Sequence, residues 1–265
     1  MNFLPNASEI LDTENSAKPL ELYVFIDPTD ADCYGLVPVL RRLQVEYEQY
    51  FTYRIIMKTC LSPQKSLGQG PHDTRIPHPA LPAVAVKAAE FQGKRAGFKY
   101  LSRLLDYRFL KERDVTTPEV LLEIADLIGI DTAEFAQDFR SVNAAKSFQC
   151  DLYISREMEV HQAPSFVFFN NNFEDEGLMV DGIHDYEIYV KVLEELLGDQ
   201  MKKSVPPSLD ELFRRFDSLT TGEIAAIYKV STRTAERELK KRLLQRRIEC
   251  LPVRGATLWR RKMDL

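Results

Sequence analysis

The sequence predicts an α/β protein with a small basic unit at its C-terminal end. Apolar runs at 20–27 and 51–57 have the composition of strands, and a segment of helical character lies between them. A long stretch with helical spacing of apolar residues follows, and strand-like runs return only near residue 165. After Pro206-Pro207 the charge changes sign, with 14 Lys/Arg against 8 Asp/Glu from Pro206 onward, and 21 against 32 before it.

The first unit begins as strand, helix and strand. Residues 1–18 are polar and without pattern, which predicts a mobile tail. The run at 20–27 is predicted as a buried strand and 37–50 as the helix after it. Residues 51–57 alternate aromatic and β-branched side chains, which indicates a second strand.

A helical insert at about residues 81–160 follows the second strand. Its helices are predicted at 81–91, at 97–109, from Thr117-Pro118 onward, from Asp131 onward, and at 143–159. The first is rich in alanine and valine, and the second gathers five apolar side chains on one face. A cap residue followed by proline marks the start of the third helix, and an aspartate in the cap position marks the start of the fourth.

The chain then returns to the sheet. A strand entered through a proline is predicted at 162–170, a short hairpin partner at 177–182 and a closing helix at 186–197. The order strand–helix–strand, helical insert, strand–strand–helix is that of a thioredoxin fold with a helical insertion. This domain is predicted to cover residues 19–203.

The turn after the first strand carries the chemistry. A strand that leads into a helix through a Cys-x-x-Cys turn is the thioredoxin-like redox motif, and Cys33 stands in its second position. Asp30 occupies the first position, so the attacking nucleophile is missing. Disulfide exchange needs an attacking thiolate and a second thiol, and a carboxylate supplies neither. We therefore predict a degenerate redox motif and no catalytic residue, with Asp30 favouring the N-terminus of the next helix.

Cysteine usage and composition exclude several other classes. Cys33 has two interpretations, a small half-buried core residue, which we favour, or a reactive thiol. The four cysteines (Cys33, Cys60, Cys150 and Cys250) are scattered, which favours reduced thiols in a cytoplasmic protein. Four histidines without paired spacing give no metal signature, and no cofactor is predicted. No apolar run has membrane-spanning length, and the N-terminus lacks the regions of a signal peptide.

Residues 204–265 have the pattern of a small winged-helix-like domain. The predicted elements are a helix capped by Ser208 and running to 216, helices at 221–228 and 232–246, and a hairpin at 248–260. Arg233, Arg237 and Lys240 on the third helix would suit DNA phosphates. Interspersed glutamates oppose a polyanion, so we favour protein docking and expect no specific nucleic acid.

Three short motifs connect the first unit to a known family. They are Asp27-Pro28 with Cys33-Tyr34, the run KAAEFQG at 87–93, and the run APSFVF at 163–168. With these motifs, most of residues 20–198 resembles the DsbA/FrnE-type thioredoxin family. In that family the third segment carries a cis-proline beside the active site, which implies that Pro164 is cis.

More narrowly, the chain resembles the YjbH/SpxH adaptors of Gram-positive bacteria. The run FIDP at 25–28, the run GLVPV at 35–39 and the C-terminal appendage carry this resemblance. It implies a cytoplasmic, non-enzymatic adaptor that binds an Spx-type regulator and promotes its degradation by ClpXP. It also implies Tyr34, Ala163 and Pro164 as partner-binding residues. Asp30 departs from the cysteine that the family commonly has.

Two other functions stay open from the sequence. One is a DsbA/FrnE-like thiol oxidoreductase that works with Cys33 alone. The other is a DNA-binding regulator that uses the C-terminal unit. The missing nucleophile disfavours the first, and a binding surface needs no thiol pair, so the adaptor is the preferred hypothesis.

Overall fold

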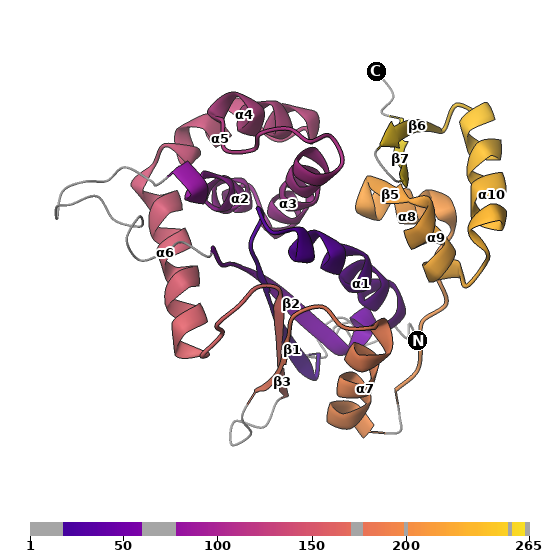
Figure 1. The fold of residues 1–265 in the computed structure, drawn as a ribbon, viewed down its shortest axis with the longest axis horizontal. Coiled ribbons are helices and arrows are strands. Elements are labelled where there is room, and N and C mark those ends of the chain that lie inside the picture. Colours follow the sequence, from indigo (N-terminus) through magenta and orange to yellow (C-terminus); the bar gives the residue numbers. More distant parts are fainter. Residues whose placement is uncertain (1–17, 60–77, 171–176, 199–200, 254–255, 263–265) are drawn as a thin grey trace, which may run out of the picture.

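The computed structural model describes residues 18–59, 78–170, 177–198, 201–253 and 256–262. It shows two units side by side, a larger α/β unit and a smaller C-terminal one (Figure 1). Of the tail predicted at 1–18, only Lys18 falls within the described residues.

The larger unit is built on a four-stranded sheet in the order β2-β1-β3-β4. Strand β1 (Leu20–Ile26) runs parallel to β2 (Phe51–Met57) and antiparallel to β3 (Ser165–Asn170). Strand β3 pairs in turn with β4 (Leu178–Asp181), also antiparallel. Strand β2 therefore lies at one edge of the sheet, with β1 as its neighbour.

Both faces of this sheet are buried. Leu22 and Val24 of β1 belong to the main core, whereas Phe25, the residue after Val24, packs against Val160 and Val167 on the opposite face. Successive side chains of a strand point to opposite faces, so a sheet covered on both sides needs a continuous apolar run. This is why the predicted strand at 20–27 has no polar alternation.

The helices of the larger unit surround the sheet, with α2 to α5 gathered together and α6 beside β2 (Figure 1). They are α1 (Ala31–Tyr47), η1 (Glu48–Tyr50), η2 (His78–Ala80), α2 (Leu81–Phe91), α3 (Lys94–Phe109), α4 (Pro118–Leu127), α5 (Thr132–Phe139), α6 (Val142–Glu157) and α7 (Tyr186–Leu197). The predicted order of strands and helices is confirmed, and α2 and α7 have the predicted bounds.

The first helix begins six residues earlier than predicted. Helix α1 starts at Ala31 rather than at 37, because the Asp30 side chain accepts a hydrogen bond from the backbone N–H of Asp32 and caps it. Pro38 lies inside the helix, on its exposed side. Helix α3 also starts three residues early, directly after Gly93, whose φ of +117° is one that glycine adopts readily.

Short polar side chains set the starts of five other helices. Asp131, Ser141, Ser208, Thr220 and Ser231 each accept a hydrogen bond from a backbone N–H in the first turn. At Thr220 the bond is reciprocal, since the side chain of the third helical residue bonds back to the cap residue's N–H.

The smaller unit has three helices and a three-stranded antiparallel sheet in the order β5-β7-β6. Its elements are α8 (Leu209–Phe216), β5 (Ser218–Thr220), α9 (Thr221–Tyr228), α10 (Thr232–Leu244), β6 (Ile248–Val253) and β7 (Ala256–Arg261). Strand β5 was not predicted, because three residues carry no readable alternation. Trp259 and Phe213 are fully buried at the centre of this unit.

The two units share a packed junction. Val45 of α1 belongs to the apolar core of the smaller unit, and Phe98 of α3 packs against the same core. The connecting segment also follows α1, where the N–H of Ser204 donates to the carbonyl oxygen of Glu46 at 2.8 Å. The smaller unit therefore sits on α1 and α3 of the larger one.

Candidate functional site

The predicted redox turn is closed by hydrogen bonds to Asp27 and Asp30. The Asp27 carboxylate accepts from the backbone N–H of Thr29 at 2.8 Å and from its hydroxyl at 2.7 Å. Asp30 donates its backbone N–H to the Asp27 carbonyl at 3.2 Å and uses its side chain to cap α1. The carboxylate in the attacking position therefore organises the turn and the helix start.

Cys33 is a buried thiol with no second sulfur in its motif. Its side chain is 0% exposed, and its Sγ accepts a hydrogen bond from the N–H of Asp27 at 3.2 Å. Burial raises the pKa of this thiol far above its ordinary value; the Asp27 N–H bond opposes the shift, and the charges of Asp30 and Asp27 add to it. The thiol is therefore protonated near neutral pH, which fits the core-residue interpretation.

The segment at Pro164 lies level with the end of β1. The Ala163–Pro164 peptide bond is cis, the isomer that the sequence predicts. Ser165 pairs with Phe25, so the antiparallel register, continued by one residue, places Pro164 opposite Ile26. Pro164 is buried and Ala163 half-buried, next to the start of the turn.

The loop after β4 also reaches the start of α1. The N–H of Gly182 donates to the Pro164 carbonyl at 2.7 Å. A Cβ on Gly35 would lie 3.0 Å from the Cδ1 of Ile183, so these two residues approach closely. Ile183 is 43% exposed and gives this face an apolar side chain that the sequence did not single out. Its place in a polar turn offered no periodic signal.

Tyr34 lies in a different direction from Pro164. Its ring stacks on Phe109 of α3, with centroids 5.4 Å apart. Burial raises the pKa of the Tyr34 hydroxyl, and the charges of Asp106 and Glu223 raise it further. The ring therefore points toward the junction with the smaller unit, and the structure does not bring it together with Ala163 and Pro164.

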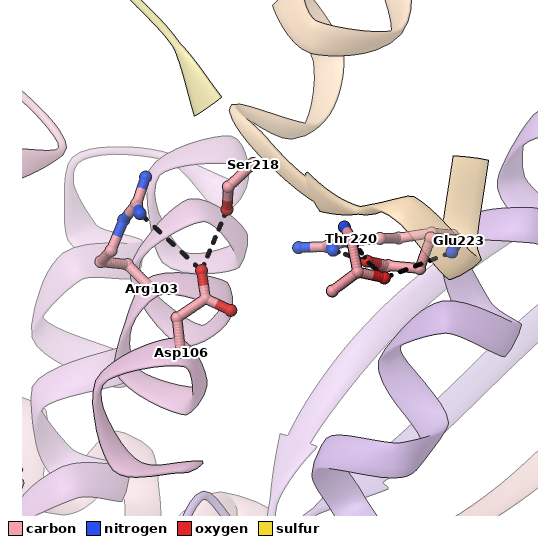
Figure 2. A network of polar contacts seen from close by, with 6 residues as sticks. Arg103, Asp106, Ser218, Thr220 and Glu223 are labelled. Carbon is pink, nitrogen blue, oxygen red and sulfur yellow. Dashed lines mark hydrogen bonds and ion pairs between the residues drawn. The ribbon is translucent and has the colours of Figure 1, made fainter. Parts of the chain in front are cut away.

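A buried ion pair crosses that junction, and sequence reasoning missed it. Arg41 of α1 donates to the Glu223 carboxylate of α9 at 2.6 Å, and both side chains are 4% exposed. Burial lowers the pKa of Arg41, but the charges of Glu223 and Asp106 raise it above its ordinary value overall. Glu223 also accepts bonds from the N–H and hydroxyl of Thr220, so one carboxylate caps α9 and holds the two units together (Figure 2).

A second set of polar contacts lies beside this pair. Figure 2 shows Arg103 and Asp106 of α3 facing Ser218 of β5. The Ser218 hydroxyl donates to Asp106 at 3.0 Å, and an Arg103 Nη1 lies 3.7 Å from the same carboxylate oxygen. Burial raises the pKa of Asp106 above its ordinary value, and the positive charges of Arg41 and Arg103 only partly oppose this shift. These contacts fix how the units meet.

The three basic residues predicted on α10 are exposed, and two of them form ion pairs with glutamates of the same helix. Lys240 lies 2.7 Å from the Glu236 carboxylate, and Arg237 lies 3.9 Å from that of Glu238. Arg233 is exposed at the start of the same helix. Glutamates therefore balance much of the positive charge that would contact a phosphate backbone.

Neither a metal centre nor a membrane span occurs in the described part of the chain. Within those residues, no group of three or more His, Cys, Asp or Glu side chains could hold a metal ion. No helix among them is both long and apolar enough to cross a bilayer. Cys33, Cys150 and Cys250 are free thiols.

Comparison of the sequence with protein families matches a thioredoxin model over residues 23–191. Similar proteins include the "ClpXP adapter protein SpxH" of Shouchella clausii, 36% identical over 97% of this chain and 92% of that protein. Proteins of the same name from Bacillus licheniformis and Bacillus subtilis are 37% and 33% identical, each over 92% of this chain and 89% of its own length.

The fold is similar to those of solved thiol–disulfide proteins. The alpha-DsbA1 protein of Wolbachia pipientis aligns with a TM-score of 0.52 and 12% identity, over 68% of this chain and 86% of that one. The oxidoreductase DsbA of Xylella fastidiosa aligns with a TM-score of 0.50 and 16% identity, over 68% and 85%. At these identities the likeness concerns the fold alone.

Proposed function

Since the chain belongs to the family of thioredoxin-like ClpXP adapter proteins named SpxH, we propose that it delivers a protein substrate to ClpXP without dithiol catalysis. The substrate we propose is an Spx-type transcriptional regulator, the protein from which these relatives take their name. Such a role places the chain in the cytoplasm, where free thiols such as Cys33 persist.

The observation that carries the proposal is the state of the redox turn. The relatives named as adapters match this chain along most of its length, whereas the attacking position holds Asp30 and Cys33 is buried with a raised pKa. A thiol cycle needs an accessible thiolate, and binding does not. The preserved frame is therefore better suited to holding a partner than to exchanging disulfides.

We place the partner-binding face beside this turn. Ile183 is exposed against Gly35, and Ala163 and Pro164 lie level with the end of β1. The larger unit is strongly acidic, with 32 Asp/Glu against 21 Lys/Arg before Pro206, which would steer a basic partner surface toward it. Tyr34 lies in the first turn of α1, and its role in this proposal is indirect, because its ring stacks on Phe109 of α3.

The test is a reconstituted degradation assay with purified ClpXP and an Spx-type regulator. Adding this chain should shorten the half-life of the regulator, and Cys33→Ala should do so equally well. Ile183→Asp should weaken binding of the regulator by more than about tenfold, as loss of a central apolar contact does. Ile188→Asp is the matched control, since Ile188 is a similarly exposed isoleucine (39%) on α7 that is not part of the proposed face.

Two outcomes contradict the proposal. Equal half-lives with and without the chain, at every concentration, would exclude the adaptor function for this regulator. Acceleration that disappears in Cys33→Ala, together with turnover in an insulin-reduction assay, would instead favour an oxidoreductase.

For residues 204–265 we propose a winged-helix-like module that docks protein, with residues 19–203 as the thioredoxin-like domain. Its order helix–strand–helix–helix–strand–strand supports this assignment. The pairing of Lys240 with Glu236 supports protein docking over DNA binding. We expect only weak DNA association that disappears with added salt and shows no sequence preference, measured by gel shift. A sequence-selective complex at physiological salt would make a DNA-binding regulator the better proposal.

A further inference from the structure

A groove runs along the outer edge of β2, the edge that faces away from β1, outside the site described above. Its volume is about 920 Å³, and it follows Phe51 to Ile56 of the edge strand. Residues from α3, α6 and the start of the smaller unit complete it, among them Phe98, Ile154 and Phe216. We call it the β2-edge groove. It therefore joins a sheet edge to apolar side chains in one hollow.

The edge strand presents backbone groups to this groove. The N–H of Lys58 donates to Ile26 of β1, and amide directions alternate along a strand, so residues 51, 53, 55 and 57 point their N–H groups away from β1. The Phe51 N–H bonds to the Glu48 carbonyl, and the Met57 N–H bonds to the Asp151 carboxylate at 2.8 Å.

Between these two capped ends, the amides of Tyr53 and Ile55 face outward. Neither has a hydrogen-bond partner among the residues that the structure describes. Two consecutive outward amides with their carbonyls form the template onto which an extended chain adds as a strand. The edge therefore has the length and spacing for a short added strand.

The charge of the groove indicates the charge of the strand that would bind there. Six basic and three acidic residues line it. The three carboxylates already have cationic partners: Glu90 and Asp151 pair with Lys87, and Glu48 pairs with Arg215. Lys18, Lys94 and Arg95 form no ion pair with a described carboxylate, and the last two are exposed. The groove therefore keeps a surplus of positive charge.

The start of α3 brings part of this positive charge together with the end of a helix dipole. Lys94 and Arg95 are its first two residues, and its first turn contains no acidic residue. Its cap, Gly93, gives the helix no side-chain hydrogen bond. The positive end of the helix dipole and two lysine or arginine side chains thus lie together at the groove, where a carboxylate is favoured.

We propose that the β2-edge groove binds an extended acidic segment of another protein, which adds to the four-stranded sheet as a fifth strand beside Tyr53 and Ile55. Its alternate side chains would meet Phe98 and the basic residues at the start of α3. This binding needs neither ClpXP nor the turn at Cys33, so it stands or fails apart from the adaptor function.

The first experiment measures fluorescence anisotropy with the full chain and labelled peptides. A short peptide that alternates valine and glutamate should bind, and one that alternates valine and lysine should bind more than about tenfold more weakly. Two further versions of the acidic peptide carry methyl groups on the backbone nitrogens, one at the valines and the other at the glutamates. One of these two versions should lose binding, because a strand turns alternate amides toward its neighbour. Equal binding of the acidic and basic peptides would overturn the proposal, as would full binding by both methylated peptides.

The second experiment locates the binding on the protein. The double substitution Lys94→Glu with Arg95→Glu should lower the affinity for the acidic peptide by more than about tenfold. It should not unfold the chain, because acidic residues suit the first turn of a helix. Lys191→Glu, on the exposed side of α7, is the matched control. Amide hydrogen exchange over 51–57 should slow when peptide is added. Unchanged exchange at these amides would overturn the proposal. Binding of the peptide that appears only after residues 1–17 are removed would also overturn it, because the occupant of the groove would then be a segment of this chain and not another protein.

Discussion

A single side chain replaces a nucleophile with a structural group. Asp30 stands where a dithiol enzyme has its attacking cysteine, and here it caps α1 through the N–H of Asp32. The helix keeps its favourable N-terminal charge, while Cys33 is left with no partner thiol in the motif and a raised pKa. The exchange therefore preserves the local structure and removes the chemistry.

The burial of Cys33 predicts low reactivity. In the native chain, iodoacetamide should modify Cys33 more than about tenfold more slowly than Cys150, because Cys33 is buried and protonated whereas Cys150 is exposed. Mass spectrometry of a time course gives both rates. In urea the two rates should converge, which is the control. Comparable rates in the folded chain would show that the thiol is accessible.

Restoring the nucleophile should restore redox chemistry. Asp30→Cys places a thiol at the cap of α1, where the helix dipole lowers its pKa, and it should form a disulfide with Cys33. Loss of the aspartate cap should cost about 1 kcal/mol of unfolding free energy. Insulin reduction measures the gain, with Asp32→Cys as a control at the wrong spacing. Equal activity of the two variants would mean that the motif geometry is not retained.

At the scale of elements, one carboxylate connects α6, α2 and the edge strand β2. Asp151 of α6 accepts from the Met57 N–H and lies 3.1 Å from the Lys87 ammonium. Burial raises the pKa of Asp151 to about 6, and Lys87 and the Met57 N–H only partly oppose it. The attachment of α6 to the sheet edge is therefore sensitive to pH.

This pKa predicts a pH dependence of stability with a definite sign. Between about pH 4 and pH 6 the folded chain holds a proton on Asp151 that the unfolded chain has released. The unfolding free energy of the natural chain should therefore fall as pH rises through that window, relative to Asp151→Asn, by up to about 3 kcal/mol. Urea unfolding of both chains at several pH values measures the difference. Parallel pH curves would contradict the raised pKa.

At the scale of the whole molecule, the buried Arg41–Glu223 pair holds the two units together. Glu223→Gln keeps the cap of α9 but leaves Arg41 without its ion-pair partner. The unfolding free energy should fall by about 3 kcal/mol. This is the lower end of the usual range, because Asp106 also faces Arg41. Urea unfolding measures this loss, and adding Arg41→Met should recover most of it.

The control for this prediction is an ion pair at the surface. Arg54 and Glu21 are 3.0 Å apart, but 55% of the Arg54 side chain and 40% of the Glu21 side chain are exposed. Glu21→Gln should therefore change the unfolding free energy by less than about 1 kcal/mol. If both substitutions cost the same, the junction pair does not lie in a desolvated environment.

Much of the fold could be predicted from the sequence, and the junction could not. Continuous apolar runs and capping residues are local signals, so β2, α7 and α9 match the predicted bounds. The start of α1 was missed because Pro38 resembles a first-turn proline. The Arg41–Glu223 pair gave no signal, since each residue looks like an ordinary surface charge in its own helix. The boundary at 203/204 stays a prediction, because Val45 belongs to the second core.

An ion pair buried at a junction also requires two distant positions of the sequence to evolve together. Any ancestor that acquired or exchanged the C-terminal unit had to match both halves of the pair, because either half alone leaves a buried charge uncompensated. A lineage that loses the glutamate at 223 is therefore expected to lose the arginine at 41 as well. Arg41 is 182 residues from Glu223, so the descent of this two-part protein should be recorded in α1, far from the segment where the chain passes from one unit to the other.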